Sequence, residues 1–176
     1  NASAVKNLAQ IANSLRSQLI HYSTDYVFDG TKSGAYTEED VTNPLNLYGK
    51  SKLKGERAIH ESGCRHLIFR TTWVIGSQGN NFAKTILQLA SERDTLSVVA
   101  DERGVPTSAT LIAMVTAQAI TDGKANHAWE DGIYNLTPTG ETTWHELACR
   151  IVDIAQGAGL MLRAQKENVK PISNAE

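Results

Sequence analysis

The sequence contains little cysteine, and its cysteines are not spaced to bind a metal. Cys64 and Cys149 are the only two, and they lie far apart in the chain. No Cys-x-x-Cys or His-x-x-x-His run is present, although structural zinc sites normally use such closely spaced ligands. We therefore expect two reduced, buried thiols in a cytoplasmic protein, with a disulfide as the alternative.

Neither charge nor hydrophobicity is concentrated in one part of the sequence. Lys and Arg number 17 against 19 Asp and Glu, and a net charge of −2 argues against a general nucleic-acid or membrane binder. No apolar stretch reaches the roughly 18 residues of a membrane span, and no signal segment opens the chain. With 41% hydrophobic and 20% charged residues, the composition excludes a disordered or collagen-like chain. The length of 176 residues fits one domain, or one domain with a small appendage.

The glycine-rich turn of a dinucleotide-binding fold is missing. Such a fold opens with a strand and then Gly-x-x-Gly-x-x-Gly or Gly-x-Gly-x-x-Gly, whose backbone approaches the pyrophosphate. Two pairs among the 13 glycines come near this pattern, Gly76 with Gly79 and Gly157 with Gly159. A bulky apolar residue occupies the third glycine position after each pair. The sequence therefore shows no pyrophosphate-binding turn, and no ribose-selecting residue after one.

Helical and strand patterns alternate along the chain. Helices are expected over about 4–15, 48–61 and 81–92, from Ser108 through 119, and over 144–155 with Thr142 or Thr143 as the cap. Short apolar strands are expected at 18–23, 66–71, 96–100 and 132–136. This alternation predicts an α/β fold with a largely parallel sheet. Ligands of such sheets bind beyond the carboxyl ends of the strands, so the residues after each strand are the candidates for chemistry.

Tyr48 and Lys52 stand four residues apart in the second expected helix, so they share one face about one turn apart. An isolated phenol exchanges protons poorly at pH 7. An ammonium group nearby favours the phenolate, and such a tyrosine can protonate a developing alkoxide or deprotonate an alcohol. A hydroxyl of Ser23 or Thr24, at the end of the first strand, would complete such a site. The pair alone is a weak signal, because the spacing often arises by chance on helix surfaces.

An ordered series of motifs accompanies this pair. It runs through residues 23–30 (STDYVFDG), 43–44 (NP), 48–52 (YGKSK), 70–73 (RTTW), 101–107 (DERGVPT) and 132–136 (GIYNL). The series resembles the extended short-chain dehydrogenase/reductase superfamily and, within it, the dTDP-4-dehydrorhamnose reductase family, over nearly the whole chain. The resemblance implies an incomplete Rossmann-like parallel sheet with helices on both faces, plus a small α/β substrate-binding lobe.

The resemblance also implies roles for individual residues. Tyr48 would protonate the C4 keto oxygen of dTDP-4-dehydro-6-deoxy-L-mannose while NADPH or NADH delivers hydride, which gives dTDP-L-rhamnose. The full set comprises a catalytic triad of Thr24, Tyr48 and Lys52, cofactor contacts from Tyr22, Tyr48 and Lys52, and substrate contacts from Thr24, Asp25 and Trp73. The resemblance is compatible with a bound Mg²⁺ ion, to which it assigns no ligands, and with a homodimer.

By comparison with that family, the chain is expected to be a fragment. Residues 1–75 would be the second half of the NAD(P)-binding Rossmann-like domain, with the catalytic residues. Residues 76–176 would be mainly the substrate-binding lobe, with interleaved Rossmann elements. The first βαβαβ unit and a C-terminal tail would be absent, so the chain is expected to bind NADPH or NADH weakly or not at all. Micromolar NADPH binding in a titration would contradict this.

Other functions and simpler structural roles remain open at this point. Another nucleotide-sugar epimerase or dehydratase of the superfamily is one alternative, and a non-catalytic regulatory subunit resembling methionine adenosyltransferase β is another. The simpler roles are a core position for Trp73, a turn-forming one for Asp25, loop capping for Asp101 and Thr107, a structural role for His21, a helix anchor for Trp144, and a solvated loop face for Glu38, Glu39 and Asp40.

Overall fold

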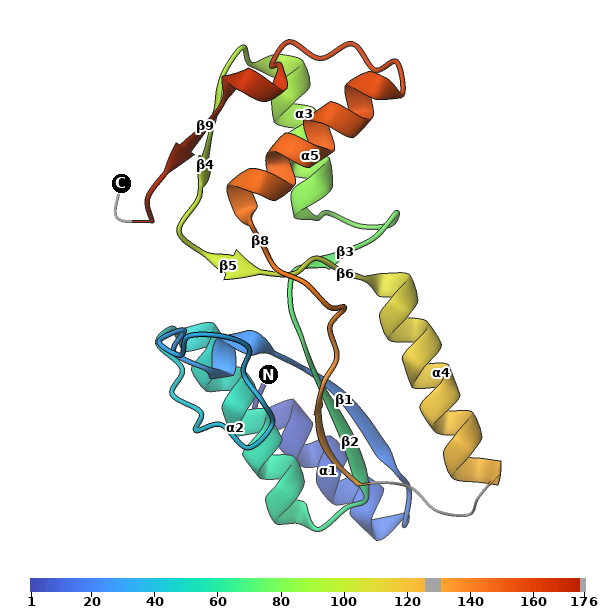
Figure 1. The fold of residues 1–176 in the computed structure, drawn as a ribbon. Helices are drawn as coiled ribbons and strands as arrows, with labels where there is room; N and C mark the ends of the chain where they lie inside the picture. The colour runs from blue at the N-terminus through green and yellow to red at the C-terminus, as the bar shows by residue number, and fades with distance from the viewer. Residues whose placement is uncertain (126–130, 175–176) are drawn as a thin grey trace. The chain divides into compact units, whose positions relative to one another are not determined.

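The computed structural model describes residues 1–125 and 131–174, which form two compact units (Figure 1). The first unit comprises Asn1–Thr72 and Ile112–Thr137, and the second comprises Trp73–Leu111 and Pro138–Glu176. Each unit has a hydrophobic core of its own. The chain passes from the first unit to the second, returns to the first and enters the second again, so neither unit is a continuous stretch of sequence.

A three-stranded parallel sheet forms the centre of the first unit. Its strand order is β1-β2-β7, with Leu19 opposite His66 and Thr24 opposite Thr71. The elements of this unit are α1 (Ser3–Ser14), β1 (Leu19–Thr24), the 3₁₀ helix η1 (Asp25–Val27), α2 (Leu47–Ser62), β2 (His66–Thr71), most of α4 (Ala109–Ala125) and β7 (Gly132–Asn135). The central strand β2 is buried over nearly its whole length, which explains its unbroken apolar sequence.

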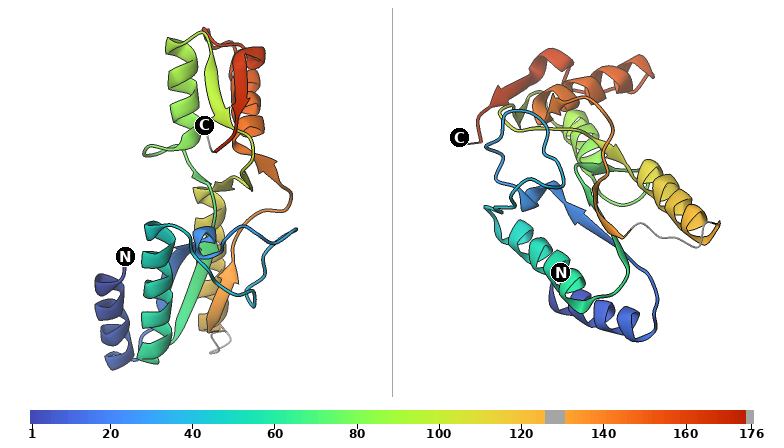
Figure 2. Two further views of the ribbon diagram at one scale, coloured as in Figure 1. Left: turned by 90° about the vertical axis from the view of Figure 1, so that its left-hand side faces the viewer. Right: turned by 60° about the horizontal axis from the view of Figure 1, so that its bottom comes forward.

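Helices cover both faces of this sheet. Figure 2 shows α1 and α2 on one face and α4 on the other. Val5, Ala9 and Ala12 recur at helical spacing on α1 and pack with Ile59 of α2 and Ile68 of β2. On the opposite face, residues of α4 pack against Leu67, Phe69 and Leu136. The layered arrangement places η1, which follows the carboxyl end of β1, beside the start of α2.

The second unit is a smaller α/β arrangement. It contains the parallel pair β4 (Leu96–Val99) and β9 (Val169–Ile172), packed by α3 (Phe82–Glu92) and α5 (Trp144–Gly157), with η2 (Lys166–Asn168) before β9. Thr143 caps α5, since its hydroxyl accepts from Glu146 N at 3.1 Å while Glu146 Oε2 accepts from Thr143 N at 3.0 Å. Of the two predicted caps, the structure therefore selects Thr143.

Four two-residue strands complete the second unit, and the sequence did not predict them because two residues show no periodicity. They are β3 (Val74–Ile75) with β6 (Thr107–Ser108), which are parallel, and β5 (Arg103–Gly104) with β8 (Thr142–Thr143), which are antiparallel.

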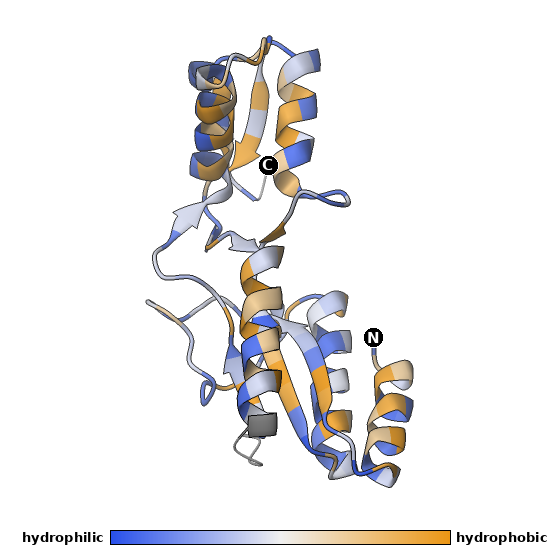
Figure 3. Ribbon diagram, turned by 90° about the vertical axis from the view of Figure 1, so that its right-hand side faces the viewer, coloured by the Kyte–Doolittle hydropathy of each residue, from blue (hydrophilic) through white to orange (hydrophobic). Residues whose placement is uncertain are grey.

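The predicted α/β fold with a mainly parallel sheet is confirmed, because every strand pair in the described part of the chain except β5–β8 is parallel. Apolar residues concentrate in the strands and helices, whereas the connecting loops are largely hydrophilic (Figure 3). Cys64 is buried, Cys149 is half-buried, and both thiols are free. Within residues 1–125 and 131–174, no helix is long and apolar enough to cross a membrane.

Candidate active site

Thr24 ends β1 with its side chain buried and its hydroxyl group engaged on both sides. The oxygen accepts from Tyr26 N at 3.2 Å, and the proton is donated to Asp25 Oδ1 at 3.0 Å, because a carboxylate can only accept. Thr24 is thereby the N-cap of η1, and Asp25 is the first residue of that turn. Since a hydroxyl carries one proton, Thr24 donates to a ligand only when the bond to Asp25 opens.

Tyr48 lies in the first turn of α2 and is 49% exposed. Asn46 is the N-cap of this helix, and its side-chain oxygen accepts a hydrogen bond from Gly49 N at 2.7 Å. A Cβ atom on Gly49 would lie 2.1 Å from the carbonyl oxygen of Tyr26, so only glycine permits this close approach. The rings of Tyr26 and Tyr48 meet edge to face with centroids 6.1 Å apart. Gly49 therefore brings the segment after Thr24 against the helix turn that carries Tyr48.

Lys52 is buried, with 8% of its surface exposed, one helical turn beyond Tyr48. Its ammonium group donates to the carbonyl oxygen of Tyr22, and its Nζ lies 3.4 Å from His21 Nε2. Burial lowers the pKa of Lys52, and the neighbouring Glu56 carboxylate opposes that shift. An ammonium group has three N–H donors, so one remains for a ligand beside the two partners described.

His21 faces Lys52 from β1, a contact that the sequence analysis missed when it assigned this residue a purely structural role. Because a charged lysine only donates, His21 Nε2 is the acceptor and the ring proton of the neutral imidazole sits on Nδ1. Burial lowers the pKa of His21 to about 4, and the positive charge of Lys52 adds to this shift. His21 is therefore neutral at pH 7.

This geometry predicts an acid-dependent loss of stability. The pKa of His21 lies near 6.5 ordinarily and at about 4 in the fold, so the unfolded chain binds the proton more tightly. The contribution of His21 to stability is complete above pH 6.5 and falls as the pH drops, by about 1 to 2 kcal/mol at pH 4 once solvent screening of the partly exposed ring is included. Urea unfolding at pH 7 and pH 4 should show a smaller loss in His21→Gln than in the unchanged chain. His60→Gln, at an exposed position of α2, should keep the full loss, and equal losses in all three proteins would contradict the prediction.

Glu56 forms a buried ion pair with Arg70, and the sequence analysis did not single out either side chain. The carboxylate accepts from Arg70 Nε at 3.1 Å and from Arg70 Nη2 at 2.8 Å, and it also accepts from the Ser23 hydroxyl. The Arg70 guanidinium also lies 5.1 Å from the centre of the Phe28 ring. The sequence offered one usable signal, because Glu56 follows Lys52 by four residues and therefore shares its helix face.

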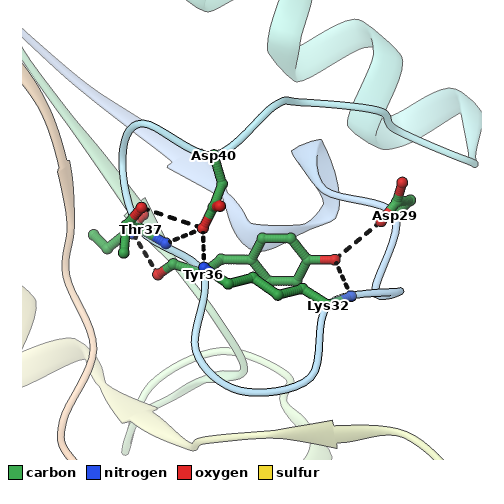
Figure 4. Close-up of polar contacts among 6 residues, drawn as sticks. Asp29, Lys32, Tyr36, Thr37 and Asp40 are labelled. Atoms are coloured by element: carbon green, nitrogen blue, oxygen red, sulfur yellow. Dashed lines mark hydrogen bonds and ion pairs between the residues drawn. The ribbon is translucent and has the colours of Figure 1, made fainter.

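The loop before α2 is held by Asp29 (Figure 4). The Asp29 carboxylate accepts from Asn43 Nδ2 at 3.0 Å, from the Thr31 hydroxyl at 2.8 Å and from the Tyr36 hydroxyl at 2.9 Å. These bonds, with that of Asn43 first, hold the pKa of Asp29 well below its usual range. The loop thus enters α2 in a fixed conformation.

The acidic residues of the same loop are bonded rather than merely solvated, so the predicted solvated face is wrong for two of the three. Asp40 accepts from Lys32 Nζ at 2.5 Å and from Thr37 N at 2.6 Å (Figure 4). Glu38 Oε1 accepts from Asn135 N at 2.6 Å, which ties the loop to the end of β7. Only Glu39 is simply exposed.

The side chain of Tyr22 points to the α4 face of the sheet, because neighbouring residues on a strand face opposite ways. Its hydroxyl lies 2.8 Å from Thr116 Oγ1, and its ring stacks on Phe69 with centroids 6.3 Å apart. The contact between Tyr22 and Lys52 is made by the Tyr22 backbone carbonyl.

Trp73 belongs to the second unit, whereas the other predicted site residues belong to the first. Its φ of 44° is unusual for a residue other than glycine and marks a constrained backbone. The half-buried ring stacks on Trp144 with centroids 3.6 Å apart and packs so closely on Gly104 that a Cβ there would lie 2.6 Å away. Trp144 also packs on the core of this unit, as predicted for a helix anchor.

Asp101 and Thr107, the two residues of this unit predicted to cap loops, lie in different surroundings. The Asp101 carboxylate accepts from Asn174 N at 2.9 Å, which is a loop contact of the expected kind. Thr107 is fully buried within β6 and pairs with Val74.

Comparison with known proteins relates these residues to a family. The profile described as the RmlD substrate binding domain matches residues 1–176. This chain belongs to that family. The dTDP-4-dehydrorhamnose reductase of Salmonella typhimurium is 48% identical to it over 173 residues, which cover 98% of this chain and 58% of the relative. The dTDP-4-dehydrorhamnose reductase of Escherichia coli K12 is 46% identical over 171 residues, which cover 97% of this chain and 57% of that relative.

A solved structure gives the same picture of the RmlD-family fold. The crystal structure of dTDP-4-dehydrorhamnose reductase from Bacillus anthracis in complex with NADP matches this chain with a TM-score of 0.87 at 34% identity. The match covers 99% of this chain and 58% of that structure. The resemblance inferred from the motifs is confirmed, and the chain spans 57% to 58% of the length of these three relatives.

A metal centre finds no support in this part of the RmlD-family chain. Among residues 1–125 and 131–174, no group of three or more His, Cys, Asp or Glu side chains is placed to hold a metal ion. No Mg²⁺ ligands are assigned, and no step of the chemistry below involves the ion.

Proposed function

We propose that this chain supplies the catalytic and substrate-binding part of a dTDP-4-dehydrorhamnose reductase. The protein would reduce dTDP-4-dehydro-6-deoxy-L-mannose to dTDP-L-rhamnose with NADPH or NADH. The observation that carries the proposal is the close approach at Gly49, which puts the start of α2, with Tyr48 and Lys52, against the segment that follows Thr24. That the family relatives of Salmonella typhimurium and Escherichia coli are dTDP-4-dehydrorhamnose reductases supports the substrate.

The proposed chemistry is reduction of a ketone to an alcohol. The bound cofactor supplies hydride to C4 of the sugar. The exposed hydroxyl of Tyr48 donates its proton to the C4 oxygen, and the nearby Lys52 ammonium stabilises the phenolate that remains. The Thr24 hydroxyl donates a hydrogen bond to the same oxygen once its hydrogen bond to Asp25 opens. Hydride on carbon and a proton on oxygen together account for the two hydrogens gained.

The remaining N–H of Lys52 fits a role in holding the cofactor, because a ribose hydroxyl is a suitable acceptor. We assign the cofactor contacts to Tyr22, Tyr48 and Lys52. The substrate contacts are assigned to Thr24, Asp25 and Trp73. Residues 1–75 would belong to the NAD(P)-binding domain and 76–176 mainly to the substrate lobe. The pairing of β7 with β2 supports Rossmann elements interleaved in the second range.

A hybrid enzyme tests this proposal. This chain replaces the matching residues of the Salmonella typhimurium reductase, which supplies the rest of the protein. With dTDP-4-dehydrorhamnose, the hybrid should oxidise NADPH and release dTDP-L-rhamnose, identified by NMR. A hybrid that folds and binds NADPH but does not turn over would contradict the proposal. Sugar isomerisation without net NADPH oxidation would favour an epimerase instead.

A further inference from the structure

The first unit buries an unequal set of charges. Among the residues that the structure describes, the buried charged side chains are Lys52, Glu56 and Arg70, with 8%, 3% and 4% of their surfaces exposed. Two buried cations, Lys52 and Arg70, are therefore accompanied by one buried carboxylate, that of Glu56, in the layer between α2 and the sheet. Unpaired charge is costly in such surroundings, so the position of that carboxylate matters for both cations.

Glu56 is held rigidly in this cluster. Arg70 of β2 binds both of its oxygens through Nε and Nη2, and the Ser23 hydroxyl of β1 binds Oε1. Three donors from two neighbouring strands fix the rotamer, as two parallel N–H bonds from arginine do in general. The carboxylate therefore sits at a defined point on the helix face that also carries Lys52, one turn earlier, and Tyr48, two turns earlier.

Lys52 has only neutral direct partners, and no ion pair of this side chain occurs among the described residues. Its contacts are the imidazole of His21 and the Tyr22 carbonyl, both from β1, and Tyr48 and Glu56 lie one turn before and one turn after it on its own helix. Glu56 is thus the one buried negative charge near the ammonium group in this part of the chain.

We propose that Glu56 is a positioning residue for Lys52. Its carboxylate, which Arg70 and Ser23 hold, keeps the Lys52 ammonium group charged and in place one helical turn from Tyr48. The role of Lys52 as a catalytic residue rests on the proposed function, but the effect of Glu56 on Lys52 does not. The opposing effects of burial and of Glu56 on the pKa of Lys52 agree with this assignment. Without the carboxylate, the lowering of the Lys52 pKa by burial would be unopposed.

Direct titration of Lys52 tests the proposal without any enzyme assay. The ¹³Cε resonance of Lys52, assigned by its loss in Lys52→Met, is followed against pH in the chain itself. Glu56→Gln should lower the pKa of Lys52 by about one unit or more relative to the unchanged chain. Glu61→Gln removes an exposed carboxylate from the same helix and should leave the titration unchanged. An identical Lys52 titration in Glu56→Gln would overturn the proposal.

A double variant keeps the test decisive if Glu56→Gln does not fold. Glu56→Gln with Arg70→Met removes both charges of the buried pair, a change that proteins often tolerate. The pKa of Lys52 should still fall, by less than in the single variant, and an unchanged value would again overturn the proposal. If Lys52 titrates as expected but the hybrid enzyme is inactive, the proposed function fails and the role of Glu56 stands.

Discussion

Tyr48→Phe lowers the turnover of the hybrid reductase by about a hundred- to ten-thousand-fold, the range expected for loss of a positioned proton donor. The substitution removes one hydroxyl group and keeps the ring, so the edge-to-face contact with Tyr26 remains. Folding should therefore change little, whereas NADPH affinity should fall modestly because Tyr48 is also assigned a cofactor contact. The measurement is kcat at saturating NADPH and dTDP-4-dehydrorhamnose, with NADPH binding followed separately by titration.

Tyr36→Phe is the matched control for this prediction. It also removes a phenolic hydroxyl from the first unit, but that hydroxyl binds Asp29 in the loop before α2. Loss of one such hydrogen bond should change kcat by less than about tenfold. If Tyr48→Phe retained turnover within the range of Tyr36→Phe, Tyr48 would not be the proton donor.

Arg70→Met destabilises the chain by about 3 to 5 kcal/mol, because it leaves the buried Glu56 carboxylate without its partner. Methionine retains much of the volume of the arginine stem, so the loss of charge dominates the loss of packing. The quantity to measure is the free energy of unfolding from urea denaturation at pH 7.

Two comparisons separate charge from packing in this experiment. The double variant Glu56→Gln with Arg70→Met should recover most of the lost stability, since no unpaired charge remains buried. Arg163→Met breaks an exposed ion pair with Asp94 at 2.9 Å and should cost less than about 1 kcal/mol. A cost for Arg70→Met as small as that of Arg163→Met would show that the buried pair contributes little.

The sequence predicted the fold class well because strand and helix periods depend on local patterning. The apolar run from Leu67 to Phe69 indicated a strand covered on both faces, and β2 is the central strand. The four-residue spacing of Tyr48 and Lys52 placed both on one helix, and α2 carries them one turn apart. The two-residue strands of the second unit escaped prediction because they depend on pairing between distant segments.

The surroundings of the candidate site were predicted less well. His21 was assigned a structural role, yet its ring nitrogen faces Lys52. Glu56 and Arg70 were not singled out, although their ion pair is the most buried one in the described part of the chain. Such contacts join residues 14 to 31 positions apart, and no local pattern reports which buried side chains will meet.

The sequence by itself determined the alternation of helices and strands, the spacing of Tyr48 and Lys52, and the order of motifs that identified the family. These features depend on neighbouring residues or on comparison of motifs along one chain. Three features were decided only by the tertiary structure. The Thr24 hydroxyl donates a hydrogen bond to Asp25, Gly49 allows the Tyr26 carbonyl to approach α2, and two cations are buried with one carboxylate. Packing of α2 on the sheet removes these groups from water, and burial makes their mutual distances determine their charge states.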